Sequence, residues 1–152
     1  MKTKEVNDAV LRCSGDSGDG MQLTGTLFSD TAALLGNGIS TFPDYPAEIR
    51  APQGTVAGVS GFQVHIGSQR VLTPGDYCDV LVAMNPAALK ANACWLKKDS
   101  TIIIDADSLD AKSVARAGFK SEDPFAELGL EGYNILTPAI TSMTRDALAG
   151  LD

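Results

Sequence analysis

The chain has 152 residues, 44% of them hydrophobic and 20% charged, so we expect one domain with a buried core rather than a disordered chain. Its formal net charge is -7 and it has no cluster of lysine and arginine, which argues against a nucleic-acid partner. No segment approaches the roughly 20 apolar residues that a membrane-spanning helix needs, so we expect no membrane partner.

Three cysteines, Cys13, Cys78 and Cys94, lie far apart in the chain, and no two have the spacing of a metal or redox motif. This pattern suits the reducing cytoplasm, where buried thiols pack as small hydrophobic groups. An iron–sulfur cluster normally takes four cysteines. We therefore expect no cluster and no metal site in this chain alone.

Apolar runs alternate with helical patterns along the chain. This alternation predicts a single α/β domain with three layers, α/β/α, around a Rossmann-like and mainly parallel sheet. A strand over 9–13 leads through the glycine-rich loop 15–20 into a helix that ends at 36–38, with Asp19 as its N-cap and Gln22 as the capping-box partner. The apolar face of this helix comprises Leu23, Leu27, Phe28, Thr31, Leu34 and Leu35.

The middle of the chain predicts three further strands. A short one over 39–42 is expected to end at Pro43, and residues 59–66 alternate as a half-solvated strand does. Residues 80–84 are apolar on both faces, which is typical of a central parallel strand. Asn85 is then expected to cap the next helix.

The last third predicts strands over 101–104 and 133–136. A short helix is expected to start at Asp123-Pro124, and a final helix is expected from Thr141 onward.

The loop Gly15–Gly20 is the most distinctive local feature. A strand, a glycine-rich turn and a helix N-terminus present backbone N–H groups that suit anions. The spacing is G-x-x-G-x-G rather than the G-x-G-x-x-G of dinucleotide loops, and Asp16 and Asp19 place carboxylates where a pyrophosphate would lie. Gly18 to Gly20 also resembles the start of a thiamine diphosphate motif, but Asp44–Ile49 lacks the asparagines which that motif requires. A tight turn without any ligand stays open as the alternative.

Four segments in chain order resemble one known family. They read SGDSGDGMQ over 14–22, FPDYPAEIRAP over 42–52, GVSGFQV over 58–64 and LVAMN over 81–85. They are similar to the gamma-type domain that precedes the pyrimidine-binding domain in the alpha subunit of 2-oxoacid:acceptor oxidoreductases, also called 2-oxoacid:ferredoxin oxidoreductases. The resemblance is strong over 8–105 and looser elsewhere.

The resemblance implies a non-catalytic domain of an enzyme complex that oxidatively decarboxylates a 2-oxoacid, here 2-oxoglutarate, to an acyl-CoA and reduces ferredoxin. Thiamine diphosphate, Mg²⁺ and iron–sulfur clusters are then expected elsewhere in the complex, and this chain alone is expected to bind no cofactor and to be inactive. Its expected partners are the thiamine-binding beta subunit and the rest of the alpha subunit. Its expected role is to position coenzyme A and to assemble the subunits. The family's domain continues past the equivalent of Asp152, so residues 1–152 are expected to be a C-terminally truncated domain.

Several residues are candidates for these contacts. Arg50 lies between two proline-stiffened turns, and its guanidinium suits a phosphate or carboxylate, with a local ion pair to Glu48 as the alternative. Tyr45 and Glu48 are expected interface anchors. Asn85 ends a central strand, where open α/β sheets bind ligands, although capping alone would explain it. The residues expected to bind coenzyme A are Gly15, Ser17, Gly18, Gly20, Arg50 and Asn85.

Two other functions stay open on the sequence. One is a stand-alone nucleotide-binding or sensing module, and the other is a pure interaction domain with an exposed apolar patch beside its final helix. The single histidine, His65, has no catalytic partner near it in the sequence, so we expect a surface or packing role for it.

Overall fold

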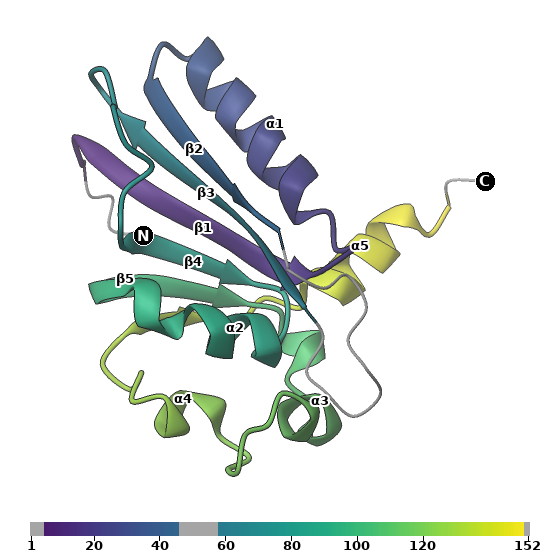
Figure 1. Ribbon diagram of the computed structural model, residues 1–152. Coiled ribbons are helices and arrows are strands. Elements are labelled where there is room, and N and C mark those ends of the chain that lie inside the picture. The colour runs from purple at the N-terminus through teal and green to yellow at the C-terminus, as the bar shows by residue number, and fades with distance from the viewer. Residues whose placement is uncertain (1–4, 46–57, 151–152) are drawn as a thin grey trace.

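The computed structural model describes residues 5–45 and 58–150 (Figure 1). Its strands form one sheet in the order β2-β3-β1-β4-β5-β6. The strands are β1 (Asp8–Asp16), β2 (Gly38–Asp44), β3 (Val59–Gly67), β4 (Cys78–Ala83), β5 (Leu96–Ile104) and β6 (Asn134–Leu136). The helices are α1 (Met21–Leu34), α2 (Pro86–Asn92), α3 (Ala111–Arg116), α4 (Pro124–Glu127) and α5 (Ile140–Leu148), with 3-10 turns η1 (Ala93–Trp95) and η2 (Ala106–Ser108).

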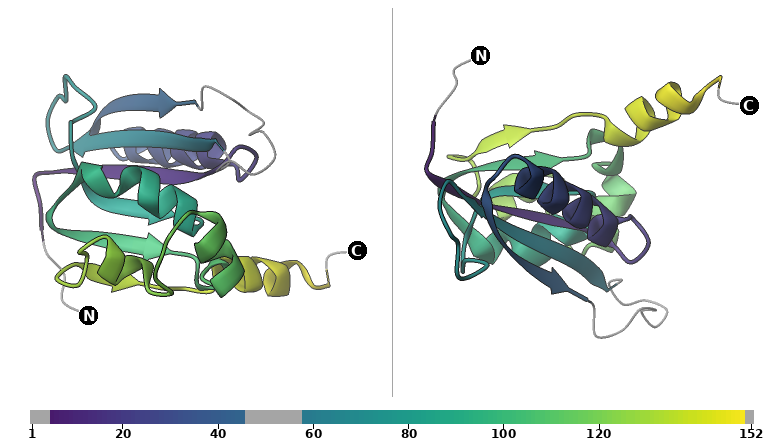
Figure 2. Two further views of the ribbon diagram at one scale, coloured as in Figure 1. Left: turned by 60° about the horizontal axis from the view of Figure 1, so that its bottom comes forward. Right: turned by 90° about the horizontal axis from the view of Figure 1, so that it is seen from above.

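The sheet is mainly parallel, as predicted. Strands β1, β4, β5 and β6 run in the same direction, and only β3 is antiparallel to its neighbours β1 and β2. Helix α1 lies on one face of the sheet, and α2, α3 and α4 lie on the other (Figure 2). The predicted three-layer α/β/α arrangement is therefore confirmed.

The main core lies between the sheet and α2. Leu81, Ile102 and Ile104 project from the parallel strands and pack against Ala88 and Leu89 of α2, and all five are 0% exposed. Each large aliphatic side chain buried in this way contributes roughly 1.5–3 kcal/mol. This layer fixes the parallel strands, and with them the positions of the loops at their carboxyl ends.

Helix α1 packs on the sheet through small side chains. Gly25, Ser29 and Ala32 are buried, and a Cβ atom on Gly25 would lie 2.1 Å from Cδ1 of Phe62. The apolar face that the sequence assigned to this helix is instead exposed, most of all at Leu34 (89%). The prediction of the buried face of α1 was wrong because this close helix–sheet approach requires glycine and small residues at the interface, not large apolar ones. The exposed apolar residues are Leu23, Leu27, Phe28, Leu34 and Leu35.

Two strand predictions also need correction. Strand β2 does not end at Pro43 but runs to Asp44, which is possible because β2 is an edge strand, where a missing N–H donor is tolerated. Strand β3 is not half-solvated: Gln63, on its polar face, is 4% exposed, and its amide bonds to the carbonyls of Pro74 and Gly75. Both faces of β3 are covered, so the polar face is a buried hydrogen-bonding face.

The sequence reading missed α3. Its N-cap is Asp110, whose carboxylate accepts hydrogen bonds from Ser113 and Lys112. The bond from Ser113 is the main cause that lowers the pKa of Asp110. The short helix that starts at Pro124 and the final helix were both predicted. Among the described residues, no helix has both the length and the apolar character needed to cross a membrane.

Candidate functional site

The predicted loop residues line a groove at the carboxyl edge of the sheet. This groove has a volume of about 540 Å³, and Ser17, Gly18 and Gly20 line it together with Tyr45. Tyr45 follows the end of β2 and is largely exposed. The remaining lining residues are Asp16, Met21, Gln22, Leu23 and Ser60. The fold thus brings one predicted interface residue to three of the predicted ligand residues.

The loop is held by its own backbone and by Asp19. Gly18 and Gly20 have positive φ angles of 116° and 76°, which favour glycine. The N–H of Asp19 donates to the carbonyl of Asp16 (3.1 Å), and Oδ2 of Asp19 accepts from the N–H of Asp16 (2.8 Å). Burial raises the pKa of Asp19, although the bond from Asp16 works in the opposite direction. The carboxylate therefore turns back onto the loop and away from the helix.

The prediction that Asp19 caps α1 is accordingly wrong. The N-cap residue is Gly20, and no side chain accepts from the first turn of α1. Gln22 is not a capping-box partner either: its Nε2 donates to the carbonyl of Gly61 (2.8 Å) and to Oγ of Ser60 (3.1 Å), which attaches α1 to β3. Within the described residues, no side chain caps the first turn of α1, and the residues of that turn, Met21, Gln22 and Leu23, line the groove.

Gly15 does not line the groove. It belongs to β1 and is buried, and a Cβ atom there would lie 2.7 Å from Oδ2 of Asp19. Its small size allows the Asp19 carboxylate to fold over the end of the strand. Gly15 therefore shapes the loop, and its predicted contact with a ligand is not supported by the groove lining.

Asn85 caps α2, as predicted, and also binds the loop. Its Oδ1 accepts from the N–H of Ala88 (2.8 Å), and its Nδ2 donates to Oδ1 of Asp16 (2.9 Å). A smaller cavity of about 90 Å³ lies beside this contact, and Ser113 and Arg116 complete its wall. Arg116 was not predicted as a site residue, because helix α3 was not predicted. The available signal was Asp110, a typical N-cap residue, followed by a helical pattern.

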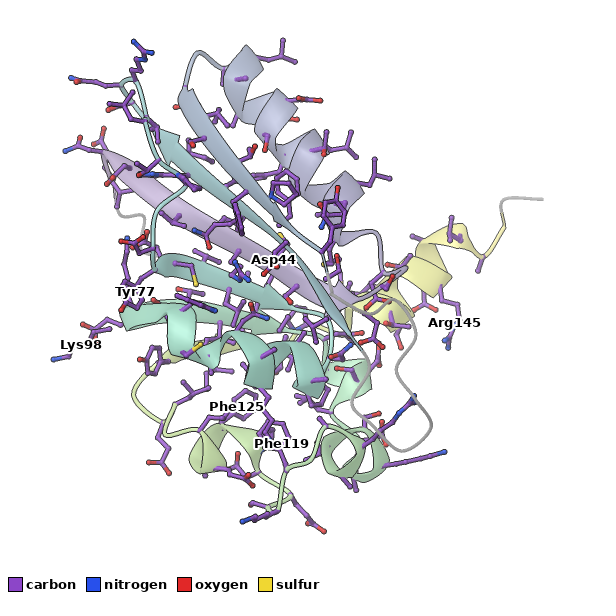
Figure 3. All side chains as sticks on the ribbon, viewed as in Figure 1. Asp44, Tyr77, Lys98, Phe119, Phe125 and Arg145 are labelled. Atoms are coloured by element: carbon purple, nitrogen blue, oxygen red, sulfur yellow. The ribbon has the colours of Figure 1, made fainter. Side chains whose placement is uncertain are left out.

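A buried arginine, Arg12, is bonded to the end of the strand that leads to Tyr45. The sequence analysis did not predict this contact. Arg12 is 7% exposed; it donates from Nε to Asn92 (2.5 Å), from one terminal nitrogen to Gln63 (3.2 Å) and from the other to Asp44 (2.5 Å). These contacts join β1, β2, β3 and α2, with Asp44 at the end of β2 (Figure 3). Since Tyr45 follows directly, this network positions the side of the groove that Tyr45 forms.

The other candidates lie elsewhere. Arg50 and Glu48 fall outside the described residues, so their predicted contacts stay predictions. His65 is far from the groove: its Nδ1 donates to the carbonyl of Thr73 (2.7 Å), and its Nε2 lies 3.2 Å from Asp8. These contacts are in keeping with the predicted surface or packing role. Over the two described ranges, no three acidic, histidine or cysteine side chains gather as metal ligands.

The comparisons with known proteins identify the family. A family model described as pyruvate ferredoxin/flavodoxin oxidoreductase matches residues 10–149. The chain belongs to this family. It is 45% identical over 148 residues to the 2-oxoglutarate oxidoreductase subunit KorA of Mycobacterium tuberculosis, and the match covers 97% of this chain but only 22% of that relative. The resemblance drawn from the four sequence segments is confirmed, and the chain spans about a fifth of the relative's length.

Two solved structures share the fold. One is the 2-oxoglutarate:ferredoxin oxidoreductase of Magnetococcus marinus, solved with 2-oxoglutarate, coenzyme A and succinyl-CoA, with a TM-score of 0.70 and 22% identity. That match covers 93% of this chain and 22% of the other. The second is the gamma subunit of a keto/oxoacid ferredoxin oxidoreductase from Geobacter sulfurreducens, with a TM-score of 0.64, 20% identity, and coverage of 92% of this chain and 66% of that one. The fold is therefore that of a gamma-type domain.

Proposed function

We propose that this chain is a gamma-type domain within a 2-oxoacid:ferredoxin oxidoreductase that acts on 2-oxoglutarate in the cytoplasm, and that its groove faces coenzyme A. The observation that carries this proposal is the groove at the end of β1, where Ser17, Gly18 and Gly20 lie beside the uncapped first turn of α1. The 45% identity to KorA supports the assignment of the substrate class.

In the proposed reaction, the 2-oxoacid loses CO₂, and its carbonyl carbon forms a bond to the sulfur of coenzyme A as the thiol loses its proton. The two electrons released reduce two ferredoxin molecules by one electron each. Thiamine diphosphate, Mg²⁺ and the iron–sulfur clusters are assigned to the remaining domain of the subunit and to the thiamine-binding beta subunit. The cysteines here do not suit a cluster, since Cys13 and Cys78 are buried and Cys94 is exposed at a distant position.

The electrostatics of the groove suit a positioning role. Coenzyme A carries several phosphate charges, and the free N–H groups and dipole of α1 attract them. Asp16 and Asp19 oppose this attraction, but both carboxylates accept hydrogen bonds: Asp16 accepts from Nδ2 of Asn85, and Asp19 accepts from the N–H of Asp16. Arg116 is a cation at the adjoining cavity, and Arg50 is proposed as a further phosphate contact. No residue of this domain is assigned a bond-making step.

The proposed interface role concerns residues that follow β2 in the sequence. Tyr45 exposes a large aromatic side chain at the edge of the groove, and such residues anchor protein interfaces. We assign Tyr45 and Glu48 to contacts with the other parts of the complex.

A charge introduced into the groove tests the coenzyme A assignment. Ser17→Glu places a carboxylate on the exposed loop and should raise the KM for coenzyme A of the assembled complex about tenfold, the effect of roughly 1.4 kcal/mol of repulsion. The KM for the 2-oxoacid and the thiamine content should not change. Ser68→Glu adds the same charge at an exposed position near His65 and serves as the control. An unchanged KM for coenzyme A in the Ser17 variant would refute the assignment.

A further inference from the structure

A second pocket, here called the aromatic pocket, lies on the face of the sheet that α2 partly covers. The strand register places Phe42, Gln63, Arg12 and Leu81 in one row across β2, β3, β1 and β4. Leu81 packs against α2, but Phe42, at the other end of the row, is 50% exposed. The first three residues of the row line a pocket of about 270 Å³. Its other lining residues are Asp44, Pro74, Gly75, Asp76 and Trp95.

Contacts within the domain fix the walls of the aromatic pocket. Nε2 of Gln63 donates to the carbonyl of Gly75 (2.6 Å), which attaches the turn after β3 to that strand. Gly75 has a φ angle of 81°, and a Cβ atom there would lie 2.8 Å from Cγ2 of Val10, so the turn packs closely on β1. The ring centroid of Trp95 lies 6.5 Å from that of Tyr77, which supports it. A preformed pocket of this kind binds without the cost of ordering its walls.

The charge of the aromatic pocket favours a cation. Its lining carries two aspartates and one arginine. Arg12 is neutralised by Asp44, which accepts from its guanidinium at 2.5 Å. Lys97 lies two positions beyond Trp95, but its ammonium group donates to Asp79 (2.7 Å). Asp76 is exposed and takes part in none of the salt bridges between described residues, so its carboxylate supplies the excess negative charge.

The combination of aromatic rings and a carboxylate suits a guanidinium group. Phe42 and Trp95 are half-exposed in the lining, and the faces of such rings attract cations, tryptophan most strongly. A guanidinium is flat and weakly hydrated, so it stacks on a ring and still pairs with a carboxylate through two parallel hydrogen bonds. The volume of about 270 Å³ is below the roughly 300–1,000 Å³ of pockets for drug-sized ligands. It therefore fits one side chain rather than a whole cofactor.

We propose that the aromatic pocket receives an arginine side chain of a partner polypeptide, whose guanidinium stacks on Trp95 and pairs with Asp76. The net charge of -7 complements a basic segment on that partner. The inference is independent of the assignment of the groove to coenzyme A, because the aromatic pocket and the groove share no lining residue.

Trp95 is the only tryptophan of the chain, so its fluorescence reports directly on the aromatic pocket. The 152-residue chain is titrated with N-acetyl-arginine amide, a probe that presents the side chain without charged ends. The signal should saturate, and N-acetyl-citrulline amide, its neutral analogue of the same shape, should bind at least about tenfold more weakly. Asp76→Asn should weaken binding of the arginine probe about fivefold. Glu122→Gln removes the same charge at an exposed position outside the pocket lining and should leave binding unchanged.

Four results would overturn the proposal. A Trp95 signal that does not saturate would show that the pocket binds no guanidinium, and equal affinities for the two probes would show that it does not recognise charge. An unchanged affinity in the Asp76 variant would remove the proposed ion pair. Uncapped arginine that binds about tenfold more tightly than the capped probe would assign the pocket to a free amino acid. The KM for coenzyme A of the Ser17 variant is independent of all four, so failure of the groove assignment and failure of this proposal are distinguishable.

Discussion

Replacement of Gly25 by alanine tests how α1 is held on the sheet. A Cβ atom at this position would lie 2.1 Å from Cδ1, 2.3 Å from Cγ and 2.8 Å from Cβ of Phe62. An ordinary carbon–carbon contact is about 3.5 Å, so the helix and the ring must separate by about 1.4 Å. Rotation of the ring does not relieve the clash with Cβ of Phe62, because that atom is attached to the backbone.

The expected cost follows from two opposing effects. Overpacking of this kind costs up to about 3 kcal/mol, and alanine in place of glycine returns about 1 kcal/mol of helix propensity. We therefore expect Gly25→Ala to lower the free energy of unfolding by about 2 kcal/mol, measured by urea denaturation of residues 1–152 with circular dichroism. Thr24→Ala, at the exposed neighbouring position, should be neutral or slightly stabilising. A Gly25 variant as stable as the parent would refute the packing described for α1.

Three further predictions concern the supports of the groove and the buried thiols. Asn85→Ala should lower the free energy of unfolding by about 1 kcal/mol through loss of the α2 cap. If thermal denaturation shows the variant to be as stable as the parent, the capping role is contradicted. Arg12→Met should lower the free energy of unfolding by about 3 kcal/mol, because three side-chain acceptors lose their donor. If urea denaturation shows the variant to be as stable as the parent, these contacts contribute little to stability. Burial raises the pKa of the Cys13 and Cys78 thiols to about 11, so at pH 8 iodoacetamide should modify only Cys94, as read by mass spectrometry. Because the folded protein favours the neutral thiols, the free energy of unfolding should also fall as the pH rises from about 8.5 toward about 11. Equal modification of all three thiols at pH 8 would contradict the burial of Cys13 and Cys78 on which both predictions depend.

The layers of the fold could be predicted because they depend on local patterns. The run over 80–84 is apolar on both faces, and it did form a central parallel strand, β4. Asn85 could be assigned as a cap because its acceptor role involves a residue three positions away. The packing of α1 could not be predicted, since the buried row of Gly25, Ser29 and Ala32 carries almost no hydrophobic signal.

The site was only partly predictable for a related reason. The residues of the loop were identified because they are contiguous and rich in glycine. The network of Arg12 was not, because its partners are separated from it by 32, 51 and 80 positions in the chain. The assignment of Asp19 as a cap was wrong because its carboxylate could accept either from the first turn of α1 or from the backbone of Asp16. In the fold it accepts from the N–H of Asp16. Contacts that depend on tertiary structure therefore account for most of the differences.

The most direct test of the central claim is hydrogen exchange in the assembled complex with and without coenzyme A. If the groove faces coenzyme A, the backbone amides of residues 16–23 should exchange more slowly when it is present, since this segment contains the loop and the uncapped turn of α1. Residues 65–72, at the other end of the sheet, should exchange at the same rate in both states. Identical exchange of residues 16–23 with and without saturating coenzyme A would contradict the proposed function.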